Sequence, residues 1–129
     1  ILLANRYTLL DRSAEAQLLP LCRERGVSII AGGVFNSGIL ATGAVEGAHF
    51  DYGPAPVDIM ARVREMEGIA VKGGYPLARA ALEFPLHDPM VKSLLLGTGT
   101  VRRLQQNIEE LSQPILTGEF KKYQTLAIS

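Results

Sequence analysis

Apolar residues in this chain fall into short runs, and the longer segments between the runs carry apolar residues at helical spacing. The runs Val27–Ala31 and Ser93–Leu96 contain no charge, and Leu2–Leu10 is a third largely apolar stretch. Short uncharged runs of this kind are typical of strands in a parallel sheet that is covered on both faces. The pattern therefore predicts three parallel strands connected by helices.

The segment after the first strand predicts a helix that begins near Ser13 and ends at Arg25. Ser13 is suited to cap the helix N-terminus, and Gly26 can adopt the left-handed conformation that ends a helix. Pro20 lies inside the segment, so we expect it to kink the helix or to delay its regular part. The face expected to pack in the core contains Leu18, Leu21 and Cys22.

Two helices are predicted between the second and third strands. The first has Pro56 in its first turn and ends at Gly73-Gly74, and the second spans Leu77–Phe84. The buried stripe expected on the first of them contains Ile59, Val63, Met66 and Ile69 or Ala70.

The last part of the chain predicts two further helices. The first begins near Val101, with Thr100 as its N-cap. Its inner face is expected to contain Leu104, Ile108 and Leu111. The tail Thr117–Leu126 predicts another amphipathic helix, and we expect Phe120 and Tyr123 to pack on the body of the protein.

Two glycine-containing turns directly follow predicted strands. They are Ala31–Gly38 (AGGVFNSG) and Gly97–Thr100 (GTGT), and the second leads into a helix with Arg102 and Arg103 in its first turn. Unsatisfied N–H groups and partial positive charge at a helix N-terminus favour phosphate. On spacing alone, the glycines can equally be tight connections with both arginines solvated. The presence of two such turns favours the phosphate interpretation.

Parallel strands with right-handed helical crossovers occur in doubly wound sheets and in (β/α)8 barrels. Ligands bind at the carboxyl ends of the strands in both folds, and both glycine turns lie at such ends. Barrels often build a phosphate site from the last two βα loops, which favours the barrel. Because a whole barrel needs ~250 residues, a chain of 129 residues would form part of one.

The composition narrows the class of protein. Thirteen basic and thirteen acidic residues cancel, so charge gives no support for a nucleic-acid or anionic-membrane partner. Cys22 is the only cysteine, which excludes an intrachain disulfide and a Cys/His metal motif. No apolar run approaches the ~20 residues of a membrane span and no signal-peptide pattern is found, so we expect a soluble cytoplasmic protein. Because the sequence opens at Ile1 inside an apolar segment, we expect a piece of a longer chain.

The polar, glycine-rich stretch Thr42–Ala55 is longer than a simple connection, so we expect it to be functional or mobile. Its aromatic residues, Phe50 and Tyr52, can line a substrate mouth or pin the stretch to the surface, and the second interpretation is favoured. His49 in this stretch and the more distant His87 are interpreted as solvated loop and turn residues.

Three segments resemble the aldo-keto reductases: Tyr7–Leu40, Phe50–Pro56 (FDYGPAP) and Leu95–Asn107 (LLGTGTVRRLQQN). They are most similar to the branch that contains L-fucose, D-threo-aldose and L-galactose dehydrogenases, and the resemblance covers essentially the whole chain. It implies an α/β fold in which residues 1–129 are the C-terminal portion of a single (β/α)8 TIM barrel domain, with strands six to eight. It also implies an NAD(P)-dependent oxidoreductase that acts on a sugar or a small aldehyde.

The resemblance implies a cofactor-binding role for both glycine turns. The turn after the seventh strand would wrap the pyrophosphate of a nicotinamide cofactor through Gly32, Gly33, Phe35 and Ser37. The turn and helix after the eighth strand would hold the adenosine end through Gly97, Thr98, Gly99, Thr100, Arg103, Gln106 and Asn107. Many members have an aromatic residue at the position of Gly32, stacked on the nicotinamide. Many NADP-dependent members have a lysine at the position of Gly97, and its absence favours NAD over NADP.

The family's catalytic aspartate, tyrosine, lysine and histidine lie on earlier strands, so we predict no catalytic and no metal-binding residue in this chain. One hypothesis is that the parent protein passes a hydride between the nicotinamide and its substrate, with this segment forming cofactor-binding loops. The other is a non-catalytic truncated half-barrel. Its exposed strand edges and uncovered inner face would bind the missing N-terminal half or a second copy.

Overall fold

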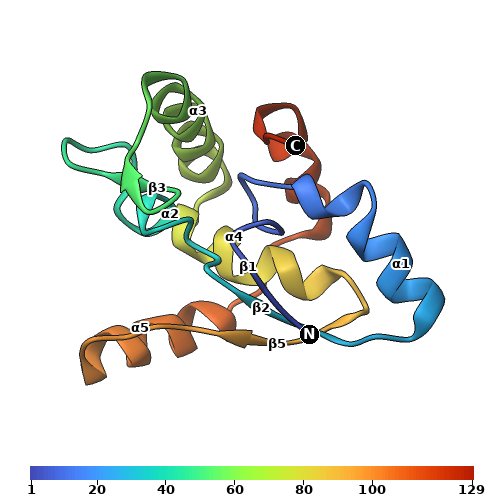
Figure 1. Ribbon diagram of the computed structural model, residues 1–129. Coiled ribbons are helices and arrows are strands. Elements are labelled where there is room, and N and C mark those ends of the chain that lie inside the picture. Colours follow the sequence, from blue (N-terminus) through green and yellow to red (C-terminus); the bar gives the residue numbers. More distant parts are fainter.

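The three strands form one parallel sheet in the computed structural model, which describes residues 1–129. In the order in which they pair, they are β1 (Leu2–Ala4), β2 (Ile29–Gly32) and β5 (Val91–Leu95). Ala31 in the middle strand pairs with Leu3 of β1 and with Leu94 of β5. Figure 1 shows these strands crossing the middle of the molecule.

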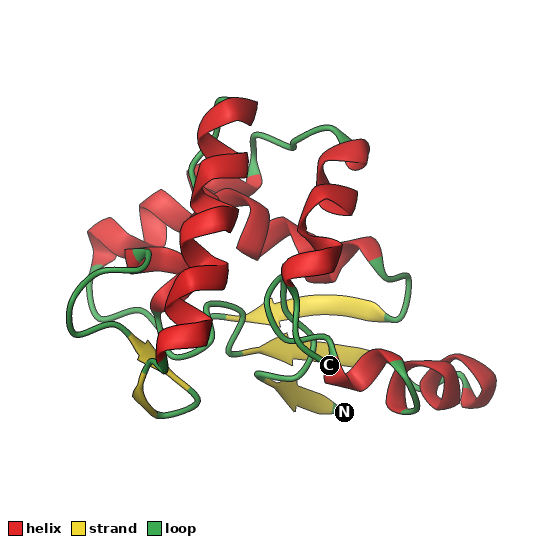
Figure 2. Ribbon diagram, turned by 90° about the horizontal axis from the view of Figure 1, so that it is seen from above, coloured by secondary structure: helices red, strands yellow, loops and turns green.

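Helices cover one face of the sheet, and a small hairpin lies apart from it. The α-helices are α1 (Leu18–Arg25), α2 (Ile39–Thr42), α3 (Val57–Gly73), α4 (Leu77–Glu83) and α5 (Val101–Leu111). The 3-10 helices span Ser13–Glu15, Phe84–His87 and Thr117–Leu126. The antiparallel hairpin consists of β3 (His49–Phe50) and β4 (Gly53–Pro54). In Figure 2 the hairpin lies beside one end of α3. No helix combines the length and apolarity needed to cross a bilayer.

The core lies on the face of the sheet that the helices cover. The predicted stripe on α3 is confirmed, with Ile59, Val63, Met66 and Ala70 all buried. Ile29 and Ala31 of β2 and Val91 of β5 belong to the same core cluster. Gly74 ends α3 in the left-handed conformation (φ 78°), as the sequence predicted.

The opposite face of the sheet is open. Leu2, Ile30 and Leu95 lie on this face with 58%, 43% and 56% of their surface exposed. The prediction that the strands are covered on both faces is therefore wrong for this face, because no element of residues 1–129 packs against it. β1 and β5 are also edge strands, each with a single neighbour.

The first strand is much shorter than the predicted Leu2–Leu10. Asn5 adopts a left-handed conformation (φ 66°) and turns the chain away immediately after Ala4. Leu9 and Leu10 are fully buried, but they belong to a loop. Burial of a loop produces the same apolar run as a strand, which explains the error.

Helix α1 begins later than predicted. Pro20 lies in its first turn, so the prediction that this proline delays the regular helix is confirmed. Ser13 is not the expected cap, because its N–H and hydroxyl both donate to Asp11 Oδ1 (3.0 and 2.7 Å). Gly26 ends the helix with φ 63°, as predicted.

The buried face of α1 differs by one position from the prediction. Leu19 and Cys22 are buried, whereas Leu21 is exposed and Leu18 is only partly buried. All four residues lie within α1, so their spacing is compatible with either face, and the packing of the helix against the body selects the side of Leu19 and Cys22.

Helix α5 has its predicted start, and Thr100 Oγ1 caps it by accepting the N–H of Arg103 (3.2 Å). Its predicted inner face is wrong for Leu104 and Ile108, which are exposed, whereas Leu111 is partly buried against the core. No residue of α5 is fully buried. Packing of Phe120 and Tyr123 is confirmed, although the tail is a 3-10 helix.

Candidate functional site

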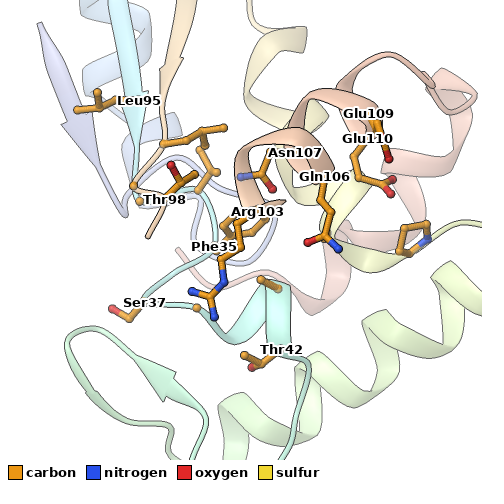
Figure 3. A pocket seen from close by; sticks show the side chains of 18 residues that line it. Phe35, Ser37, Thr42, Leu95, Thr98, Arg103, Gln106, Asn107, Glu109 and Glu110 are labelled. Carbon is orange, nitrogen blue, oxygen red and sulfur yellow. The ribbon is translucent and has the colours of Figure 1, made fainter. Parts of the chain in front are cut away.

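A cavity of about 740 Å³ lies at the carboxyl ends of β2 and β5, where the loops after these two strands meet α2, α4 and α5. We call residues Gly33–Gly38 the first glycine loop and residues Gly97–Thr100 the second glycine loop. The chain therefore brings together two segments that are far apart in the sequence. Figure 3 shows the cavity between them.

Most of the residues predicted to bind a cofactor line this cavity. Those that do are Gly33, Phe35, Ser37, Gly97, Thr98, Arg103, Gln106 and Asn107. Three others do not line it. Gly32 lies within β2, next to the side chains of Leu2 and Ala4. Gly99 and Thr100 lie outside the lining, where Thr100 is occupied with capping α5.

The first glycine loop has a tightly defined backbone. The N–H of Asn36 donates to the carbonyl of Gly33 (2.9 Å), and the N–H of Gly38 donates to that of Phe35 (3.1 Å). Gly33 has φ 60°, and a Cβ at this position would clash with Oδ1 of Asn5. Both the conformation and the space therefore require glycine here.

Ser37 lies at the edge of the cavity, next to the hairpin (Figure 3). Its Oγ accepts the N–H of Tyr52 at 2.9 Å. The hydroxyl proton is not used by this bond, so Ser37 retains one donor for a ligand.

The hairpin turn is fastened to the body of the protein by Arg6. This guanidinium contacts Asp51 and Asp11, each at 3.1 Å. The hydrogen bond to Asp51, followed in size by the one to Asp11, raises the pKa of Arg6, whereas desolvation lowers it by a smaller amount. These ion pairs were not predicted. The prediction that aromatic residues pin the stretch Thr42–Ala55 holds for Phe50, which packs partly buried against the core. Tyr52 is 79% exposed and does not line the cavity.

One cation and two carboxylates face the cavity: Arg103, Glu109 and Glu110. Glu110 is neutralised by Arg79 of α4, whose Nε lies 2.6 Å from Glu110 Oε2. Arg103 forms no ion pair within the chain. Figure 3 shows its guanidinium extending from α5 toward the first glycine loop. The arrangement can therefore offer a cation and several N–H donors to one anionic ligand.

Sequence reasoning missed the part of the lining that other helices contribute. Ala41 and Thr42 come from α2, and Pro76 and Ala78 from the start of α4. These residues carry no motif and reach the cavity only through tertiary packing. Only the α2 residues could have been predicted from the sequence, because α2 directly follows the first glycine loop.

The lining contains no tyrosine, lysine, histidine or aspartate. His87 lies against Phe120 (4.5 Å between ring centroids) and 3.3 Å from Glu83, away from the cavity. No group of three or more His, Cys, Asp or Glu side chains is arranged to hold a metal ion.

A parallel sheet with βα loops that meet at the carboxyl ends of its strands is the arrangement of ligand-binding α/β proteins, either doubly wound sheets or (β/α)8 barrels. A family model described as "Aldo/keto reductase family" matches residues 1–128. The chain belongs to the aldo/keto reductase family.

Relatives support the same assignment. The chain is 42% identical over 114 residues to pyridoxal 4-dehydrogenase of Microbacterium luteolum, covering 88% of this chain and 33% of that protein. It is 35% identical over 119 residues to D-threo-aldose 1-dehydrogenase of a Pseudomonas species, covering 92% and 36%. It therefore spans about a third of the length of these curated relatives.

Among solved structures, the chain is similar to an aldo-keto reductase from Bacillus halodurans. Both its apo and holo forms match with a TM-score of 0.75, at 25% and 26% identity. The match covers 99% of this chain and 44% or 43% of those chains. The fold is accordingly a partial barrel, and this explains the open face of the sheet.

Proposed function

We propose that residues 1–129 form strands six to eight of one aldo-keto reductase barrel domain and supply the cradle for a nicotinamide dinucleotide. The observation that carries the proposal is the shared cavity: residues of both glycine loops and of α5 line it together. Its volume of about 740 Å³ lies within the range of about 300–1,000 Å³ that is usual for small-molecule sites. The close approach of Gly33 to Asn5 and the unpaired Arg103 suit a backbone cradle for an anionic ligand.

The two ends of the cavity would bind different parts of the dinucleotide. The N–H groups of Gly33 and Phe35 and the hydroxyl of Ser37 would bind the pyrophosphate. Arg103 would lie near the adenine or the 2′-phosphate, and Asn107 at the adenine edge. The remaining cavity residues of the second loop and α5, which complete the adenosine end, are Gly97, Thr98 and Gln106.

The bound dinucleotide would supply the hydride chemistry, while this chain binds and orients it. The substrate class is a sugar or a small aldehyde, in keeping with the names of the relatives. Catalysis would require the aspartate, tyrosine, lysine and histidine that the resemblance assigns to earlier strands. We therefore expect this segment to bind the dinucleotide without turning over substrate.

The charges around the cavity favour NAD over NADP. Gly97 supplies no cation, and Glu109 lines the cavity without an ion-pair partner. A 2′-phosphate would then meet Arg103 alone, beside an uncompensated carboxylate.

Dinucleotide binding tests the proposal in the protein of full natural length. Arg103→Ala combined with Asn107→Ala should weaken NAD binding about tenfold or more, measured by calorimetry, because it removes charge-assisted and amide hydrogen bonds. Arg102→Ala is the matched control, since Arg102 lies in the same helical turn but outside the cavity. Unchanged affinity in the double variant would overturn the assignment.

A second candidate function is favoured by the open sheet face. Leu2, Ile30 and Leu95 expose apolar surface on it, and the β1 and β5 edges are unpaired. Such edges recruit other strands. If the chain acts alone as a non-catalytic half-barrel, it should self-associate or bind the missing half. Light scattering tests this, and a stable, dispersed monomer would refute it.

A further inference from the structure

Backbone strain in this chain is concentrated at one place. The non-glycine residues with positive φ are Asn5 (66°), Asn36 (50°), Ser37 (64°), Asp51 (49°) and Tyr52 (67°). They come from three separate segments: the end of β1, the first glycine loop and the hairpin turn. Such conformations are rare outside glycine and persist only where neighbouring contacts hold them.

Side-chain amides hold the three segments together. Asn36 Nδ2 donates to the backbone carbonyl of Asn5 (3.2 Å), and Asn36 Oδ1 accepts the hydroxyl of Thr8. Asn5 Nδ2 in turn donates to the hydroxyl of Tyr52 (2.7 Å). Asn5, Thr8 and Asn36 are all buried, so the two bonds of Asn36 are protected from water, whereas the bond to Tyr52 is only partly buried.

The same contacts reach the cavity-lining backbone. Asn5 Oδ1 lies directly against the α-carbon side of Gly33, where a Cβ would clash. At the other end of the loop, the N–H of Tyr52 fixes Ser37 Oγ. Tyr52 is thus connected to the loop in two ways: its backbone N–H bonds to Ser37 of the loop, and its hydroxyl bonds to Asn5, which packs against Gly33.

Burial does not explain the placement of Tyr52. Its side chain is the most exposed of the four tyrosines in the chain, and it lies in a left-handed turn without a packing partner in the core. What orients it is the hydrogen bond to Asn5, together with the neighbouring Asp51–Arg6 ion pair.

We propose that Tyr52, Asn5 and Asn36 are positioning residues that hold the first glycine loop in the conformation that receives the pyrophosphate. The inference rests on the proposed dinucleotide function. None of the three side chains lines the cavity, so they act through the loop backbone; Ser37 is held separately, by the backbone N–H of Tyr52. The loop is then preorganised, and binding does not have to order it.

The test compares ligands with and without a pyrophosphate in the protein of full natural length. Tyr52→Phe removes the hydroxyl that accepts from Asn5 while keeping the ring. Asn36→Gly removes the buried amide while tolerating the positive φ. Tyr7→Phe is the control, because the Tyr7 hydroxyl has no hydrogen-bond partner in the chain and lies outside the cavity. Binding of NAD and of adenosine is measured for each variant by calorimetry.

We expect Tyr52→Phe to weaken NAD binding about three- to tenfold, the usual effect of one hydrogen bond, and Asn36→Gly to weaken it at least as much. Adenosine, which lacks the pyrophosphate, should bind each variant as it binds the parent protein. A purely structural role would weaken both ligands together and would overturn the proposal.

The failure of this proposal differs from the failure of the proposed function. If the parent protein binds no NAD, the dinucleotide assignment itself is wrong. If it binds NAD and Tyr52→Phe binds equally well, only the positioning role is wrong. Because Tyr52 is exposed, its variant remains informative even if Asn36→Gly fails to fold.

Discussion

The two glycine loops lie on the same cavity but are built in different ways. In the first, Val34 and Asn36 are each 1% exposed, and buried amides brace the backbone. In the second, a Cβ added at Gly97 or at Gly99 would have no atom within 4 Å, and the following helix buries no residue. The difference indicates that the first loop is preformed, whereas the position of the second loop depends on a few polar contacts.

Adding one methyl group to each loop gives the largest expected contrast. Gly33→Ala should reduce the free energy of unfolding by about 2–3 kcal/mol, because it combines an unfavourable positive φ with a clash against Asn5. Gly97→Ala, with open space around it, should change stability by about 0.5 kcal/mol or less. Urea denaturation measures both. Equal effects would mean that the loops are not differently constrained.

The open second loop should also accept a large charged side chain. Gly97→Lys is expected to shift the ratio of NADP to NAD affinity about tenfold toward NADP, because it adds a cation beside Arg103. Stability should not change. Competitive binding of the two dinucleotides measures the ratio, and Gly118→Lys, another site with open space but outside the cavity, is the control.

An ion pair between Arg79 and Glu110 connects α5 to α4. Arg79→Ala should lower the local stability of α5 by about 1 kcal/mol, since this pair is half-buried and connects an otherwise unburied helix to the body. Amide hydrogen exchange in α5 should accelerate while exchange in α3 stays unchanged. Lys122→Ala, which removes an ion pair at the tail, should leave α5 exchange unaltered.

The smallest effect is expected at the start of α5. Thr100→Ala removes the side-chain cap and should destabilise the first turn by about 0.5–1 kcal/mol. Thr117→Ala serves as control, because Thr117 forms no capping bond. Faster exchange at the Arg103 amide in the first variant alone is the expected result.

Local signals in the sequence predicted much of this molecule. The α3 stripe, the glycine stops at Gly26 and Gly74 and the Thr100 cap depend on residues close in sequence, and each is confirmed. The location of the candidate site could also be predicted from the sequence, because the carboxyl ends of neighbouring parallel strands lie side by side.

Features that depend on distant partners were not predicted. The apolar run through Leu10 was read as a strand because nothing local reveals the turn at Asn5. Leu104 and Ile108 were expected to be buried, yet the chain holds no surface that covers them. The amide contacts between Asn5, Asn36 and Tyr52 span 31 and 47 positions, and no periodicity encodes them.

The bracing of the first glycine loop has a consequence for biosynthesis. Every group that shapes this loop lies between Asn5 and Tyr52, whereas the second loop begins at Gly97. Because chains emerge from the ribosome N-terminus first, one wall of the cavity can assemble while the residues of the other are still being translated.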